Sequence, residues 1–130
     1  MVDGRRVGAA LAVFALVGCG ADTYDHDAGP VLDKAKKVAS LTDSEVGTLC
    51  DWLVMEHGGY GNTITCGPET ISVYADQAAC KPRLTPVLQA CPNATVGQYQ
   101  ACIAVTAVDP CDTSRTMSAE CQTFDAACGR

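Results

Sequence analysis

The sequence predicts a mainly α, small disulfide-rich domain with two main helices and a short β-hairpin. Nine of its 130 residues are cysteines, and eight of these follow residue 49. Two stretches, beginning at Thr42 and Thr95, combine a helix-capping pattern with apolar residues at helical spacing. Two β-branched runs separated by glycine and proline lie between them. We place the domain at residues 40–130, because a chain of this length suits one hydrophobic core.

Residues 1–18 have the organisation of a signal peptide. Two arginines at positions 5–6 precede an apolar run over residues 7–17, which is shorter than the roughly 20 residues of a membrane-spanning helix. The run ends in the motif Leu-Val-Gly-Cys at Cys19, which resembles the lipobox of bacterial lipoproteins. That resemblance implies cleavage before Cys19 and acylation of its thiol by chains such as palmitate, which anchor the protein to membrane lipid. The alternatives are an ordinary buried helix and a soluble secreted protein with a free Cys19.

The sequence next to the anchor bears on localisation. Gly20, rather than aspartate, follows Cys19, and in sorting of the enterobacterial type this favours the outer membrane. We therefore expect a lipid-anchored protein of the bacterial cell envelope, in the outer membrane. Residues 19–39 show no apolar periodicity, which predicts a flexible tether. The Asp-His-Asp cluster at residues 25–27 is interpreted as part of this solvated tether, with weak binding of a divalent cation as the alternative.

Charge limits the classes of partner. The chain has a net charge of −6, and loss of residues 1–18 would remove two arginines and one aspartate. The mature chain would therefore be slightly more acidic. Because no basic surface is predicted, nucleic acid is not an expected partner.

The cysteines of the domain form an even set, which in an exported protein is typical of a disulfide framework. No C-x-x-C motif occurs, whereas structural zinc sites and thioredoxin-like sites usually contain close pairs. We therefore predict neither a metal nor a redox site. The connectivity stays open, but two cysteines at similar distances from their helix caps lead us to predict a Cys50–Cys102 bridge. The predicted disulfide cysteines are Cys50, Cys66, Cys80, Cys91, Cys102, Cys111, Cys121 and Cys128.

The first main helix is predicted to begin after Thr42. The residues from Thr42 to Glu45 fit the capping box S/T-x-x-E, in which two backbone N–H groups receive side-chain partners. Two glycines after His57 end the helix. Trp52 lies off its apolar stripe, at a second contact or partly exposed. The stripe consists of Val46, Leu49, Cys50 and Leu53.

A hairpin and a broken helix are predicted next. The β-branched runs 63–66 and 70–74 flank a short Gly-Pro-Glu segment, as in a hairpin that needs a staple to be stable. Residues 76–84 are predicted to form a brief helix. Pro82 interrupts it and it ends before Pro86, because proline lacks the N–H of the helical hydrogen bond.

The second main helix is predicted to begin after Thr95, again with a capping box, and to end at Asp109 and Pro110. Its apolar face consists of Val96, Tyr99, Ile103 and Ala107. Three cysteines and few large apolar residues follow. A short helix over residues 118–126, held mainly by covalent links, is expected there.

A set of short motifs spans residues 41–128. They are Leu41-Thr42, Cys50-Asp51-Trp52, Gly58-Gly59-Tyr60-Gly61 before Cys66, Ala94-Thr95-Val96 between Cys91 and Cys102, and Asp109-Pro110-Cys111. This pattern resembles the small cysteine-rich lipoproteins that occur in many copies in myxobacteria and related bacteria. The motifs are structural, so the resemblance implies no activity and no catalytic residue.

Candidate catalytic groups are few. His57 is the only histidine of the predicted domain, and its position favours a contact with a helix C-terminus. A triad would need it beside Ser72 or Ser118 and a carboxylate, and no G-x-S-x-G context occurs. Asp51 and Glu56 are five positions apart and do not share a helix face. We predict no enzyme, no catalytic residue and no cofactor.

The expected function is that of a non-catalytic, disulfide-rich interaction domain. Acylated Cys19 would anchor it in the cell envelope, where its partner would be an unknown envelope protein or a polymer. One alternative is a carrier of an apolar small molecule, with a cavity between the helices. The other is an exported enzyme inhibitor that acts through an exposed loop such as residues 58–62.

Overall fold

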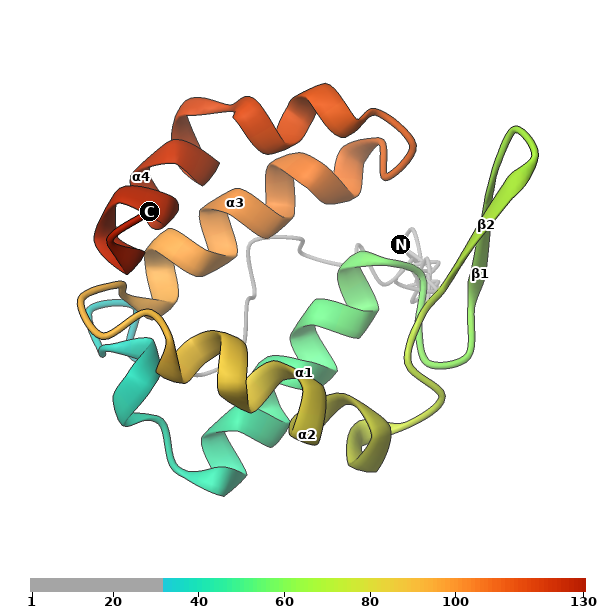
Figure 1. Ribbon diagram of the computed structural model, residues 1–130. Coiled ribbons are helices and arrows are strands. Elements are labelled where there is room, and N and C mark those ends of the chain that lie inside the picture. Colours follow the sequence, from blue (N-terminus) through green and yellow to red (C-terminus); the bar gives the residue numbers. More distant parts are fainter. Residues whose placement is uncertain (1–31) are drawn as a thin grey trace, which may run out of the picture.

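The computed structural model describes residues 32–130, and in this part of the chain helices dominate. In chain order its elements are η1 (Val38–Ser40), α1 (Asp43–Glu56), β1 (Thr63–Cys66), β2 (Glu69–Ser72), α2 (Gln77–Gln89), α3 (Val96–Val108), η2 (Thr113–Met117) and α4 (Ala119–Cys128). α1 packs against α2, and α3 packs against α4 and η2. The β1–β2 hairpin extends away from the helices at one side of the molecule (Figure 1). The predicted fold class, a mainly α, small disulfide-rich domain, is confirmed.

Both predicted capping boxes are present. At the start of α1 the Glu45 N–H donates to the Thr42 hydroxyl at 3.3 Å, and the Thr42 N–H donates to the Glu45 carboxylate at 2.7 Å. Gln98 and Thr95 exchange the same two bonds at the start of α3, at 3.3 and 2.9 Å. Each box gives partners to N–H groups that the first helical turn leaves free. α1 also ends where predicted, with His57 as its C-cap.

α2 differs from its prediction. It runs unbroken through Pro82 and Pro86, so the predicted brief helix over residues 76–84 is wrong. Each proline removes one hydrogen bond, to the carbonyl group of Ala78 or of Pro82. These residues are exposed, so water can reach the freed carbonyl groups. The opposite face of α2 holds the helix in place by packing and buries Cys80, Leu84 and Leu88.

β1 and β2 form the predicted antiparallel hairpin, with Ile64 opposite Ile71. Its two-residue turn begins with Gly67 at a φ of 62°, a conformation that glycine adopts without strain. Every residue of β2 is exposed, so the hairpin has little core of its own. A disulfide between Cys66 and Cys111 supplies the predicted staple.

Four disulfides join the described elements and use all eight predicted cysteines. The pairs are Cys50–Cys80, Cys66–Cys111, Cys91–Cys128 and Cys102–Cys121. The disulfide framework is therefore confirmed. The predicted Cys50–Cys102 bridge is wrong, because α1 packs mainly on α2 while α3 packs mainly on α4.

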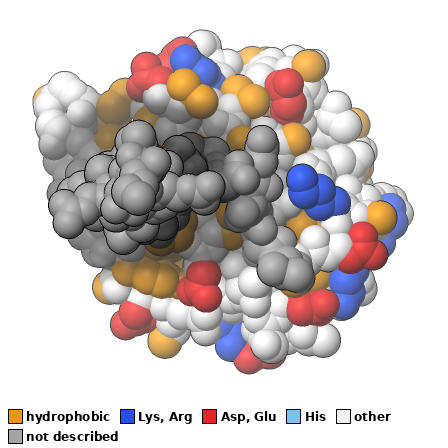
Figure 2. Space-filling model, turned by 180° about the vertical axis from the view of Figure 1, so that it is seen from behind, with side chains coloured by type: hydrophobic (Ala, Val, Ile, Leu, Met, Phe, Trp, Pro, Cys, Tyr) orange, Lys and Arg blue, Asp and Glu red, His pale blue; other side chains and the backbone are white. Residues whose placement is uncertain are grey.

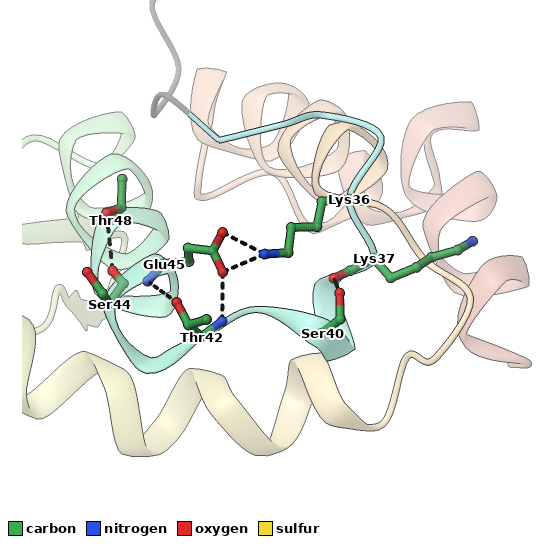
Figure 3. A network of polar contacts seen from close by, with 7 residues as sticks. All are labelled: Lys36, Lys37, Ser40, Thr42, Ser44, Glu45 and Thr48. Carbon is green, nitrogen blue, oxygen red and sulfur yellow. Dashed lines mark hydrogen bonds and ion pairs between the residues drawn. The ribbon is translucent and has the colours of Figure 1, made fainter.

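The segment before α1 is attached to the helices. The Lys36 ammonium group donates to both carboxylate oxygens of Glu45, at 2.6 and 2.8 Å (Figure 3). The Val38 N–H donates to the Ala94 carbonyl group at 3.0 Å, and the Val96 N–H donates to the Lys36 carbonyl group at 2.9 Å. The Val38 side chain is 1% exposed and belongs to the core.

The folded body thus starts before the predicted boundary at residue 40. For residues 32–39 the prediction of a flexible tether is wrong, because one apolar side chain and several backbone bonds hold this segment. The signal peptide at 1–18, the acylation site Cys19 and the cluster at 25–27 lie outside the described residues.

The core lies where the helices meet. Its largest fully buried side chains include Leu49 and Val54 of α1, Leu88 of α2 and Val96 of α3. Trp52 is partly buried and packs against this core. Its sequence position had indicated either such a contact or partial exposure. Between residues 32 and 130, no helix has the length and apolar character needed to cross a membrane.

Candidate functional site

A pocket with a mainly apolar lining lies between α1, α2, α3 and the chain that follows β2. Its volume is about 440 Å³, within the roughly 300–1,000 Å³ of small-molecule sites. The lining comes from segments that are distant in sequence, so the pocket exists only in the folded domain. Its aliphatic side chains include Leu53 and Val54 of α1, Leu84 and Val87 of α2, and Ile103 of α3.

The loop after α1 positions one wall of this pocket. The Val73 N–H donates to the Asn62 carbonyl group, and the Gly61 N–H donates to the Tyr74 carbonyl group, both at 2.8 Å. The Asn62 amide also donates to the His57 carbonyl group at 2.8 Å. These bonds hold the chain after β2 beside the end of α1, where Val73 and Tyr74 line the pocket.

Tyr99 lines the pocket from α3 and is 6% exposed. Its ring meets that of Phe124 edge to face, with the centroids 5.5 Å apart and the planes at 64°. Burial, and to a smaller extent the nearby Tyr74, raises the pKa of Tyr99 above its ordinary value. The phenol is therefore neutral near pH 7 and can donate a hydrogen bond. None of the hydrogen bonds within residues 32–130 includes this hydroxyl.

The pocket also brings together His57 and Ser72, two of the candidate catalytic residues. His57 Nδ1 lies 2.9 Å from the Leu53 carbonyl oxygen, which places the ring at the C-terminal end of α1 as expected. No hydrogen bond joins His57 to Ser72 within the described residues, and no acidic side chain of this part of the chain lines the pocket. Ser118 is occupied elsewhere, because its hydroxyl caps α4. The described residues therefore assemble no triad.

The second candidate set, Asp51 and Glu56, forms no pair. Asp51 accepts from the Tyr60 hydroxyl at 2.6 Å and from the Gln77 amide at 3.0 Å. Desolvation, followed by the bond to Asp51, raises the pKa of Tyr60. One carboxylate oxygen of Asp51 thus holds the loop after α1 through Tyr60, and the other holds the start of α2 through Gln77. Across residues 32–130, no group of three His, Cys, Asp or Glu side chains could hold a metal ion.

The carrier alternative drawn from the sequence included a cavity between helices, but Arg83 and Tyr74 of its lining were not singled out. One available signal was that no acidic residue lies within four positions of Arg83. Leu53 also lines the pocket. It belongs to the predicted apolar stripe of α1, and in the structure it is only half-buried because it faces the pocket. Searches found no matching family model, no matching curated protein and no matching solved structure for this chain.

Proposed function

We propose that this protein is a lipid-anchored protein of the bacterial cell envelope and that its disulfide-rich domain acts by binding rather than by catalysis. In this proposal acylated Cys19 holds the chain in the outer membrane, as in the cysteine-rich myxobacterial lipoproteins that its motifs resemble. One observation carries the proposal. Four disulfides cross-link the helices and the hairpin around an apolar pocket.

The disulfides support export of the chain. Such bonds persist in oxidising compartments and are rare in the cytosol, and a lipobox-like motif at Cys19 provides a matching export signal. On the face shown in Figure 2, lysine and arginine side chains are scattered among acidic ones rather than gathered into a basic area. This distribution agrees with a partner other than nucleic acid.

Two kinds of partner fit a binding domain, an envelope protein or polymer and an apolar small molecule. The pocket favours the small molecule, because a concave and mainly apolar lining is typical of small-molecule sites. A carrier is therefore the second candidate function. The inhibitor alternative stays a prediction, and its loop at residues 58–62 is hydrogen-bonded to the body of its own domain.

The anchor and the disulfides are tested together by the intact mass of the native protein extracted in detergent. We expect a chain that starts at an acylated Cys19, takes up no thiol alkylator before reduction and takes up eight alkyl groups after it. A chain without lipid, or one with several free thiols, would contradict the proposal.

Binding is tested with a neutral apolar dye, N-phenyl-1-naphthylamine, and the full protein in lipid nanodiscs. We expect saturable fluorescence above that of empty nanodiscs. Val87→Trp should abolish it, because Val87 lines the pocket and is 45% exposed, and a tryptophan there would fill the cavity. Met117→Trp is the matched control, because Met117 is 70% exposed and lies outside the pocket. Equal dye binding by both variants would exclude the pocket as the binding site.

A further inference from the structure

The pocket differs in charge from the rest of the protein. The chain has a net charge of −6. None of the described residues that line the pocket is acidic, and apart from tyrosines its titratable side chains are His57 and Arg83. An acidic protein thus presents a cationic group beside an apolar cavity. That combination complements a ligand with an apolar body and an anionic end.

Arg83 is available for such a ligand. Its guanidinium group takes part in none of the ion pairs or hydrogen bonds within residues 32–130. The other cation of α2, Lys81, pairs with Asp43 of α1. Arg83 is exposed at the edge of the pocket, where a ligand can approach it without unfolding any element.

The rest of the lining suits an alkyl chain. Aliphatic side chains from three helices face the cavity. Tyr99, a buried residue, adds a neutral hydroxyl that has no hydrogen-bond partner among the described residues. A volume of about 440 Å³ is at the small end of the range for ligand sites, which favours one chain over the two chains of a phospholipid.

We propose that this pocket binds a single-chain amphiphile with a carboxylate head, of the fatty-acid class, with its chain between α1, α2 and α3 and its head at Arg83. The planar guanidinium group matches a carboxylate with two parallel hydrogen bonds. The inference rests on the proposed binding function and names its ligand. It goes beyond a general apolar carrier, because it requires that the negative charge of the ligand increase its affinity for the pocket.

The test uses dodecanoic acid with a photoreactive diazirine in its chain, and dodecanol with the same group as the uncharged match. Each is cross-linked to the full protein in nanodiscs of zwitterionic lipid, and labelled sites are located by peptide mass spectrometry. Arg83→Gln removes the charge at the pocket, and Arg130→Gln removes one charge at the exposed C-terminus, outside the pocket lining.

We expect the acid to label pocket residues of α1, α2 and α3 saturably in the parent protein. Arg83→Gln should raise the concentration for half-maximal labelling about twofold to fivefold, as expected for one exposed charge pair, and Arg130→Gln should leave it unchanged. The alcohol should label the parent and Arg83→Gln equally. Salt between about 0.05 and 0.5 M should weaken labelling of the parent by the acid but not of Arg83→Gln.

Other results would overturn the inference. Equal labelling of the parent and Arg83→Gln by the acid would show that charge is not recognised, while dye binding would still support the proposed apolar site. Equal losses in Arg83→Gln and Arg130→Gln would indicate only a general charge effect. Failure of both dye and acid would remove the binding function as well, so the two failures are distinguishable.

Discussion

In the α1–α2 pair, both helices bury large aliphatic side chains, among them Leu49 and Leu88, and one disulfide joins them. In the α3–α4 pair, α4 has a single large apolar residue, Phe124, and two disulfides hold this short helix in place. The comparison shows how one small domain combines two sources of stability. Hydrophobic burial dominates where large aliphatic residues are available, and covalent links replace it where they are scarce.

The largest effect should come from a cavity in the α1–α2 pair. Leu49 is fully buried, so Leu49→Ala should lower the free energy of unfolding by about 2–5 kcal/mol. Urea unfolding followed by circular dichroism measures this change. Ile71→Ala is the control, because Ile71 is 42% exposed on the hairpin and should cost much less. Equal costs would show that α1 is not held mainly by packing.

A somewhat smaller effect should follow from removal of the link between α3 and α4. The double substitution Cys102→Ala and Cys121→Ala should cost about 2–4 kcal/mol, because the unfolded chain becomes less restricted. Hydrogen exchange should show lost protection in α4 while α1 and α2 keep theirs. Equal loss of protection in all four helices would mean that the α3–α4 pair does not depend on its disulfides more than the α1–α2 pair does.

Removal of the two helix N-caps, Thr42 and Thr95, should have smaller effects on stability, and the two effects can be compared directly. Thr95→Ala should cost about 1 kcal/mol, and Thr42→Ala should cost less, because Thr95 is half-buried and Thr42 is exposed. Thermal unfolding of both variants tests the order. Thr95→Ser keeps the hydroxyl and should stay close to the parent, and a Thr95→Ser variant as unstable as Thr95→Ala would show that the hydroxyl is not the cause.

The smallest effect should appear only in acid. The ammonium group of Lys36, and then the backbone N–H of Thr42, lower the pKa of Glu45 from 4.5 to about 2. Its stabilising contribution is therefore complete above about pH 4.5 and is lost as the pH falls towards 2. Urea unfolding between these pH values should show a weaker pH dependence for Glu45→Gln than for the parent.

The matched control for the acid experiment is Glu69→Gln. Glu69 is exposed on β2 and takes part in none of the ion pairs within residues 32–130. This variant should follow the pH dependence of the parent more closely than Glu45→Gln does. A parent-like response of Glu45→Gln would contradict the role assigned to Lys36.

The helix caps, which were predicted correctly, depend on neighbouring residues, whereas the partner of Cys50 and the continuity of α2, which were not, depend on distant ones. Thr42 and Thr95 cap helices through bonds to residues three positions away, so their pattern is visible in the sequence. The partner of Cys50 depends on which helix packs on α1, and spacing does not contain that information. Pro82 was expected to interrupt α2 because proline disfavours a helix locally, but packing of the opposite face outweighs this preference.

The pocket is predictable only in part for the same reason. The carrier alternative included a cavity between helices, but the polar lining of the pocket includes His57 at the end of α1, Arg83 of α2 and Tyr99 of α3. No sequence period brings these residues together. Their chemistry becomes apparent only when the helices are placed in space.

The attachment of residues 32–41 has a mechanical consequence for a chain pulled from its N-terminal side. Within the described residues the first disulfide begins at Cys50, so tension would first load the backbone bonds that join this segment to Gly97, Val96 and Ala94. Rupture of those bonds would release ten residues, or at most roughly 35 Å of chain at about 3.3–3.6 Å per residue. The segment would then lengthen under load while the cross-linked helices, and the pocket between them, kept their shape.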